Sequence, residues 1–122
     1  MSEHFKVAEA KCKDGTPYPK QWYPRLHELF HALEIVRALT GKPMRLHSVY
    51  RTKEHNDKVG GAPDSCHLKG YAADFELEGM SPKELYPILD RFQRLGVLPK
   101  GGLHAYSTFV HLDIEGSRLR RW

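Results

Sequence analysis

The sequence predicts an α+β domain, with helices packed on one side of an antiparallel sheet. Helical and strand patterns follow one another in the order helix, strand, strand, helix and strands, which favours this class. The 122 residues are enough for one hydrophobic core, and no repeat or Pro/Gly/Ser-rich linker divides them. Residues 1–122 are therefore expected to form a single domain.

The first long helix is expected over residues 24–40, after a segment with several turn formers. Pro24 suits the first helical position, and Gly41 marks the end. His27 and His31 lie four residues apart on this helix, but no Glu-rich zinc-protease signature accompanies them, so they are expected to face solvent or to pack. The apolar side chains recur at helical spacing and form one face. They are Leu26, Leu29, Phe30, Leu33, Val36 and Leu39.

The middle of the chain is expected to contain a strand, a small helix and a second strand. The first strand lies near residues 44–49, and the small helix begins near Thr52 and ends at Gly60. Residues 71–78 alternate in the manner of a strand. This alternation places Asp74 on the face opposite the apolar side chains.

The last third of the chain is expected to contain a helix and the clearest strand. Residues 81–84 form a capping-box pattern with proline at the first helical position, and Gly96 ends the helix. At residues 109–114, apolar and polar side chains alternate, so His111 and Asp113 lie on the same face. One face of this strand is expected to enter the core, and the other to present a metal ligand and a carboxylate.

Two imidazoles and one carboxylate indicate a zinc site. His67 and Asp74 lie close together in the sequence, and His111 lies far downstream. Three such ligands leave a fourth position for water, as in catalytic rather than structural zinc sites. Cys66 adjoins His67, but a packed thiol is favoured over a fourth ligand, because adjacent residues rarely both reach one metal. We expect one zinc ion per chain and a metallohydrolase.

Hydrolysis of an amide also needs a base and a positive group near the developing oxyanion. Asp113 is the candidate base, and accepting a hydrogen bond from a ligand histidine is an equal alternative. Glu76 shares a strand face with Asp74 and is a further candidate acid. Arg51 is the candidate donor to the oxyanion or to a substrate carboxylate. His104 is expected to be an exposed loop histidine, with proton donation as the alternative.

The net charge of the chain excludes few classes of binding partner. The formal net charge of +4 favours an acidic partner only mildly. The basic residues are scattered, apart from three arginines at 118, 120 and 121, and no aromatic-basic pattern of a nucleic-acid module is visible. No nucleic acid is therefore expected to bind.

Cys12 and Cys66 do not form a zinc-finger pair, and either one disulfide or two free thiols fit.

Several phrases resemble the zinc peptidases of the D-alanyl-D-alanine carboxypeptidase family, especially its short, single-domain phage-type and bacterial members. The pattern Ser-x-His-x-x-Gly-x-Ala-x-Asp is matched at residues 65–74, and Tyr-Arg-Thr followed by Glu-His-Asn at residues 50–56. Val-Gly-Gly-Ala-Pro occupies residues 59–63, and Phe-Val-His-x-Asp residues 109–113. Residues 5–7 and 12–15 also resemble the family's opening, so the resemblance covers nearly the whole chain.

The resemblance implies an α+β fold shared with hedgehog-type and lysostaphin-type zinc domains. It implies that His67, Asp74 and His111 bind zinc and that Arg51 contacts the substrate or the transition state. The implied substrate is the peptide part of peptidoglycan. An L-Ala-D-Glu endopeptidase and a D-Ala-D-Ala carboxypeptidase both fit this resemblance.

The chain departs from the family pattern at three positions. Several members place an acid three residues before the last histidine ligand, where this chain has Thr108. This departure moves the candidate base to Asp113. Val49 and His104 stand where short members usually or often have glycine, and both changes are expected to reshape the substrate groove.

The leading interpretation is an endolysin-like zinc peptidase that degrades the cell wall. The alternative is a zinc-stabilised cell-wall binding module without turnover, because hedgehog-type domains hold the metal without evident peptidase function. Residues 1–6 lack the apolar stretch of a signal peptide, and no segment suits a membrane span. We expect a monomer made in the cytoplasm that does not bind membranes and reaches the wall through a holin-type pore, by lysis or with a phage particle.

Overall fold

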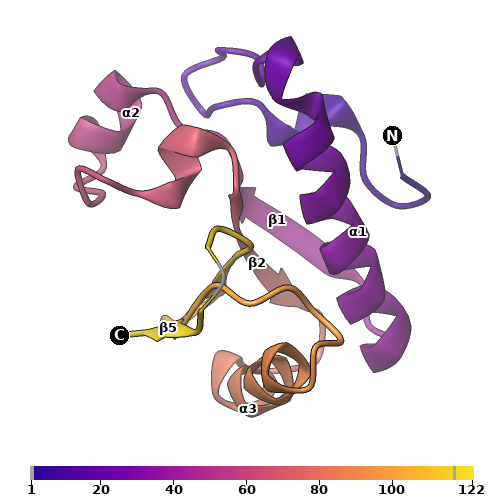
Figure 1. Cartoon of the computed structure of the whole chain (residues 1–122). Helices are drawn as coiled ribbons and strands as arrows, with labels where there is room; N and C mark the ends of the chain where they lie inside the picture. The colour runs from indigo at the N-terminus through magenta and orange to yellow at the C-terminus, as the bar shows by residue number, and fades with distance from the viewer. Residues whose placement is uncertain (1, 117) are drawn as a thin grey trace.

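The structure, a computed structural model, describes residues 2–116 and 118–122. Its strands form a five-stranded sheet in the order β1-β2-β4-β3-β5, and Figure 1 shows how the elements are arranged. The strands are β1 (Met44–Ser48), β2 (Ala72–Leu77), β3 (Gly102–Ala105), β4 (Val110–Asp113) and β5 (Arg120–Arg121). The helices are α1 (Tyr23–Thr40), α2 (Lys53–Lys58) and α3 (Pro82–Arg94), with short 3-10 helices η1 (Val7–Ala10), η2 (Lys20–Trp22) and η3 (Cys66–Lys69).

The sheet is antiparallel except at one edge. β1 pairs with β2, β2 with β4 and β4 with β3 in antiparallel fashion. The sequence predicted an antiparallel sheet, but neither these individual pairings nor the bounds of β3. β5 adds a fifth strand, which the sequence did not predict, and it runs parallel to β3. β5 consists of Arg120 and Arg121 alone, and two arginines show no alternation of apolar and polar residues that would indicate a strand. The predicted α+β class is confirmed.

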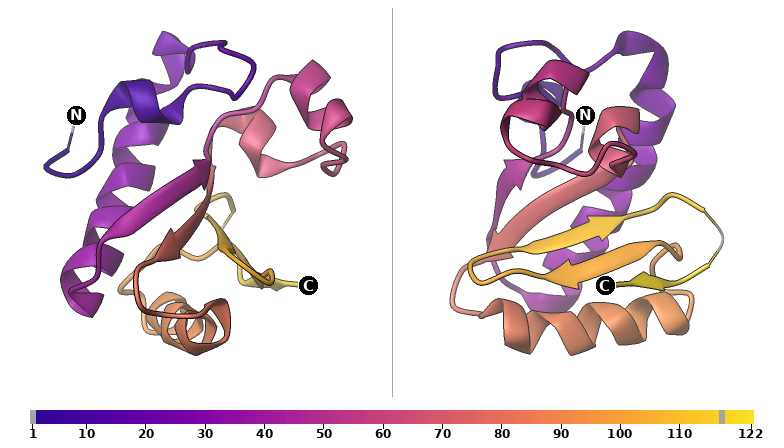
Figure 2. Two further views of the ribbon diagram at one scale, coloured as in Figure 1. Left: turned by 180° about the vertical axis from the view of Figure 1, so that it is seen from behind. Right: turned by 90° about the vertical axis from the view of Figure 1, so that its left-hand side faces the viewer.

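α1 and α3 pack on one face of the sheet and share one hydrophobic core with its inward-facing side chains. The opposite face is open along β2, β4 and β3, as the right-hand view of Figure 2 shows. The expected apolar face of α1 is buried except for Leu39, which lies in the last turn and is 57% exposed. His27 and His31 are exposed, as expected.

Within the described residues, no helix combines the length and apolar character that crossing a membrane requires.

Local sequence signals explain where the helices begin and end. The Ser81 hydroxyl accepts a hydrogen bond from the Glu84 backbone N–H, and the Glu84 carboxylate accepts one from the Ser81 backbone, which is the expected capping box. Gly41 ends α1 in the left-handed conformation. Thr52 caps α2 by accepting from the backbone N–H of His55. The predicted helices therefore form close to their predicted ends.

Candidate metal centre

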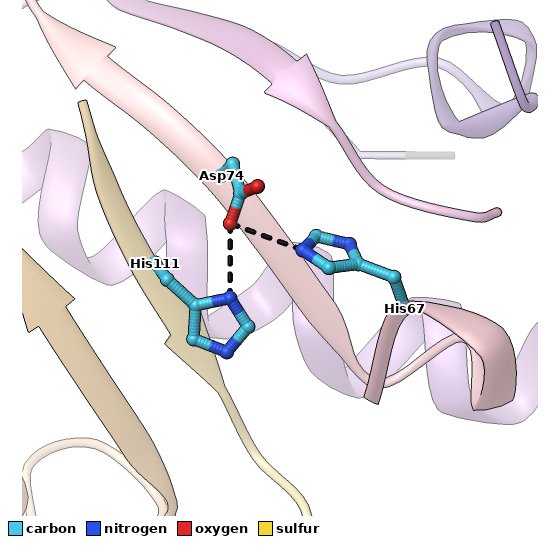
Figure 3. A group of neighbouring side chains, drawn as sticks. All are labelled: His67, Asp74 and His111. Atoms are coloured by element: carbon cyan, nitrogen blue, oxygen red, sulfur yellow. Dashed lines mark hydrogen bonds and ion pairs between the residues drawn. The ribbon is translucent and has the colours of Figure 1, made fainter. Parts of the chain in front are cut away.

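A row of polar side chains crosses four strands on the open face of the sheet. Ser48 of β1 pairs with Asp74 of β2, Asp74 pairs with His111 of β4, and His111 pairs with His104 of β3. Directly paired residues in antiparallel strands point to the same face. His67 reaches this row from η3, beside β2, as Figure 3 shows. Strand register therefore brings together residues that are far apart in the sequence.

The three predicted ligands converge on one carboxylate oxygen. His67 Nε2 lies 3.0 Å and His111 Nδ1 2.9 Å from Asp74 Oδ1. One ligand atom from each residue lies within 4.8 Å of the others, and all three residues are buried. Figure 3 shows both imidazoles pointing toward the Asp74 carboxylate. The structure thus places His67, Asp74 and His111 in the arrangement that a metal site requires.

The hydrogen bonds of His67 leave one nitrogen available to a cation. Its Nδ1 lies 2.6 Å from the carbonyl oxygen of Val49, and a carbonyl only accepts, so Nδ1 carries the proton. The other nitrogen, Nε2, is buried without a hydrogen-bond partner, although it faces Asp74 Oδ1. Two lone pairs facing each other in a buried place repel, and a cation between them removes the repulsion. This donor set fits zinc.

His111 is oriented in the same way by Asp113. The Nε2 of His111 lies 2.9 Å from Asp113 Oδ2, which leaves Nδ1 facing Asp74. The Oδ1 of Asp113 accepts from the backbone N–H groups of Gly102 and Glu115 and from the Arg120 guanidinium. Asp113 is fully buried, and it does not line the cavity above the three ligands. Its carboxylate is therefore occupied in holding His111.

Electrostatics in the cluster keep the Asp74 carboxyl ionised. Burial alone would raise the pKa of the Asp74 carboxyl, but contacts with His111 and His67 outweigh it and hold this pKa well below its usual range. Burial alone would lower the pKa of His111, but Asp113 and Asp74 outweigh it and raise this pKa. The carboxylate stays ionised, and a metal ion bound here would displace protons from the imidazoles.

The glycine of the His-x-x-Gly phrase has a steric explanation. Gly70 ends η3 in the left-handed conformation, with φ of +76°, which disfavours any residue with a Cβ. A Cβ at this position would lie 2.4 Å from the Tyr18 hydroxyl oxygen. The same hydroxyl donates a hydrogen bond to the Gly70 carbonyl at 2.9 Å. Gly70 therefore permits the left-handed turn between His67 and Asp74 and the close contact of the backbone with Tyr18.

Arg51 lies beside the cluster and is already bound by three partners. Its Nη2 lies 3.1 Å from Asp74 Oδ2, its Nη1 3.2 Å from Asn56 Oδ1, and its Nε 3.3 Å from the Ser48 hydroxyl. Asn56 is fully buried and anchors this group. Arg51 also lines the cavity. Its geometry adds a role that the sequence did not predict, the orientation of the Asp74 carboxylate.

Both cysteines are free thiols and are buried. The Cys66 sulfur lies 2.7 Å from Glu115 Oε2 and belongs to no described metal cluster. Burial, followed by the hydrogen bond to Glu115, raises the pKa of Cys66 to about 12. Cys66 is therefore a packed thiol in the wall of the cavity, as the sequence favoured.

The other candidates lie away from the ligand cluster. Glu76 Oε2 lies 3.3 Å from His47 Nε2, and Glu76 does not line the cavity. Thr108 is exposed in the turn before β4. His104 was expected in an exposed loop, but it lies in β3 and is half-buried, because it pairs with His111. Its Nδ1 contacts the backbone oxygen of Trp122.

A cavity of about 270 Å³ opens above the three ligands. Its walls include three residues that the sequence did not indicate as site residues: Arg120, Trp122 and Tyr106. Arg120 and Trp122 reach the site only because β5 pairs with β3, and no local pattern announces that pairing. The available signal in the sequence was the cluster of basic residues at 118, 120 and 121. That cluster is equally typical of a solvent-exposed tail and of a cavity wall, so it did not identify the wall.

Comparison with known proteins identifies the family. A family model described as Peptidase M15 matches residues 2–113. The chain belongs to the peptidase M15 family. Membership confirms the resemblance on which the sequence interpretation depended, the expectation of a peptidase family and the α+β fold class.

This M15 chain is also similar to proteins named peptidoglycan L,D-endopeptidase MepK. It is 33% identical over 97 residues to the proteins of that name from Escherichia coli strain K12 and from Shigella flexneri. The matched region covers 74% of this chain and 51% of each relative. The M15 chain therefore spans about half the length of the curated relatives it matches.

Proposed function

We propose that this protein is a zinc-dependent peptidase that hydrolyses an amide bond in the peptide part of peptidoglycan. The observation that carries the proposal is the convergence of His67 Nε2 and His111 Nδ1 on Asp74 Oδ1 beneath an open cavity. A structural zinc site has four protein ligands, whereas this cluster offers three. The fourth position then faces the cavity, where substrate and water enter.

Zinc held by these ligands would polarise the scissile carbonyl and activate water. The Val49 carbonyl and Asp113 fix the tautomers of His67 and His111, so that each imidazole presents a lone pair. Arg51 neutralises the outer oxygen of Asp74 and places a positive charge at the cavity wall. Of the two roles that the sequence left open for Asp113, its buried contacts favour positioning over proton transfer.

Among the cleavage sites in peptidoglycan, we propose an endopeptidase rather than a carboxypeptidase activity. The similarity to proteins named peptidoglycan L,D-endopeptidase supports this choice. The cavity is open on the face of the sheet, and an endopeptidase must admit chain on both sides of the scissile bond. A carboxypeptidase needs a closed end with a dedicated site for the terminal carboxylate.

Digestion of purified peptidoglycan by zinc-loaded protein tests the proposal, with the released fragments identified by mass spectrometry. We expect cleavage within stem or cross-linking peptides, and no cleavage by the Asp74→Asn variant. Loss of a single terminal D-Ala would show a carboxypeptidase instead. Stoichiometric zinc with no released fragment would support the alternative, a binding module without turnover.

We further propose an endolysin-like, lytic role. Cleavage of cross-links weakens the wall, so zinc-loaded protein is expected to lower the turbidity of cells whose outer membrane has been permeabilised. Asp57→Asn, which changes an exposed carboxylate on α2, serves as the matched active control for Asp74→Asn. Clearing by wild type and by Asp57→Asn but not by Asp74→Asn supports the role. Fragment release without clearing would assign the enzyme to remodelling.

A further inference from the structure

Two exposed aromatic side chains lie at the metal cavity. Tyr106 is 42% exposed and Trp122 56% exposed, and both line the cavity above the three ligands. The other large apolar side chains described as exposed are aliphatic: Leu39, Val59, Leu95 and Val97. Exposed aromatic rings grouped at the rim of a cavity offer a binding surface for an apolar or amphipathic ligand.

Trp122 is held in place although its ring is exposed. Its ring stacks on that of His104, with centroids 5.3 Å apart and an interplanar angle of 4°. It forms a T-shaped pair with the His111 ring, with centroids 5.1 Å apart. The preceding residue, Arg121, donates to Asp90 Oδ1 at 3.0 Å and to Gln93 Oε1 at 2.8 Å, both on α3. These bonds anchor β5, so the Trp122 ring is already ordered before a ligand arrives.

A second hollow shares the Trp122 side chain with the metal cavity. It has a volume of about 300 Å³ and is lined by Lys83, Tyr86, His104, Ala105 and Trp122. Trp122 lines both spaces. A substrate in the metal cavity that extends past Trp122 therefore enters a hollow with three aromatic rings, one ammonium group and no carboxylate among its lining residues.

We propose that this aromatic hollow is a subsite for a sugar ring of the peptidoglycan glycan strand, next to the stem peptide in the metal cavity. A sugar ring presents its C–H bonds on one face, and these pack on the electron-rich face of an aromatic ring while hydroxyl groups at the ring edge stay hydrated. The Lys83 ammonium is available to hydroxyl and acetamido oxygens. This inference rests on the proposed peptidoglycan substrate, and it assigns the disaccharide as part of what is recognised.

The two tryptophans allow a binding test that needs no turnover. The chain contains Trp22 and Trp122, so its two indole N–H signals are resolved by nuclear magnetic resonance and assigned with Trp22→Phe. The probe is the N-acetylglucosamine–N-acetylmuramic acid disaccharide without peptide. We expect it to shift the Trp122 signal in a saturable way and to leave that of Trp22 unchanged, because Trp22 packs on Tyr18 and Tyr50 away from the hollow.

Variants at the far wall of the hollow separate sugar binding from effects on the metal site. Tyr86→Ala is expected to weaken disaccharide binding about fivefold or more, whereas Tyr86→Phe keeps the ring and retains binding. Lys83→Ala, at an exposed position, repeats the test if Tyr86→Ala does not fold. In turnover assays, Tyr86→Ala should lower kcat/KM for a disaccharide-linked peptide and leave it unchanged for the same peptide without sugar.

The outcomes distinguish this inference from the proposed function. No disaccharide-dependent shift at Trp122, together with turnover of peptidoglycan, would overturn the sugar subsite and leave the peptidase intact. A Trp122 shift caused by the sugar-free peptide but not by the disaccharide would also overturn it, because peptide in the metal cavity would then account for the whole effect at Trp122. A disaccharide shift without any turnover would support the subsite while the peptidase proposal fails.

Discussion

Asp74 and His111 occupy directly paired positions on β2 and β4, and their side chains meet with Oδ1 and Nδ1 2.9 Å apart. Strand pairing, rather than a loop, therefore sets the spacing between two of the three ligands. A site built on paired strands is held more rigidly than one built on loops. The third ligand, His67, is fixed by its bond to Val49 in the chain segment that follows β1.

Removal of a single ligand is expected to abolish stoichiometric metal binding. His111→Ala leaves one imidazole and one carboxylate, which do not complete a zinc site. Wild-type protein should bind one zinc ion per chain, and the variant should retain less than one tenth of that after dialysis, by elemental analysis. His27→Ala, at an exposed position on α1, is the control and should bind normally. Full zinc occupancy in His111→Ala would contradict the ligand assignment.

Asp113→Asn tests whether this residue positions His111 or accepts a proton. A positioning role predicts that zinc affinity falls about 10- to 100-fold, because the bond to His111 Nε2 is weakened. A role as base predicts normal affinity with turnover lost. Competition with a fluorescent zinc chelator measures the affinity. The matched control, Asp57→Asn, should leave affinity unchanged.

Arg51→Lys tests the part that the guanidinium plays in holding the site. One ammonium group cannot satisfy Ser48, Asn56 and Asp74 together, so a buried amide and a carboxylate oxygen lose a partner. We expect the free energy of unfolding in urea to fall by about 1–3 kcal/mol. Arg45→Lys, at an exposed position on β1, should change it little. Unchanged stability with weakened catalysis would restrict Arg51 to contact with the substrate.

Gly70→Ala is expected to destabilise the protein more than a matched glycine substitution elsewhere. Gly60 has the same φ of +76°, but a Cβ there meets no atom within 4 Å. Gly60→Ala should therefore cost only the backbone strain, about 1–2 kcal/mol. Gly70→Ala adds the clash with Tyr18, so its melting temperature should be clearly lower than that of Gly60→Ala. Equal melting temperatures would show that Tyr18 moves aside without cost.

The Tyr18 phenol should make stability depend on pH in the alkaline range. Burial raises the pKa of Tyr18, with a smaller opposing effect from Arg25. The unfolded chain loses this proton near pH 10, whereas the folded chain keeps it. The folded state then binds more protons, so this contribution is complete below about pH 10 and is lost as pH rises above it. Urea unfolding from pH 9 to 11 should show a steeper decline for wild type than for Tyr18→Phe, and parallel declines would contradict this account.

The grouping of His67, Asp74 and His111 could be predicted from sequence because its pattern is local in part. His67, Gly70 and Asp74 lie within one phrase, and the alternation around His111 shows which face that side chain takes. Helix ends were predictable for the same reason, since capping depends on neighbouring residues.

The walls of the site could not be predicted in this way. Trp122 and Arg120 reach the cavity through the parallel pairing of β5 with β3, which depends on side-chain bonds from Arg121 to α3. The Asp113 carboxylate contacts His111 with one oxygen and Arg120 with the other, and this arrangement likewise depends on tertiary packing. Spacing in the sequence carries no signal for either contact.

X-ray absorption spectroscopy of the zinc-loaded protein tests the central claim most directly. A catalytic site made of His67, Asp74 and His111 predicts only nitrogen and oxygen neighbours at about 2.0–2.2 Å, with one position taken by an exchangeable water. The spectrum should change when a zinc-binding inhibitor displaces that water. A sulfur neighbour at about 2.3 Å would place Cys66 on the metal, and a spectrum insensitive to the inhibitor would indicate a closed, structural site.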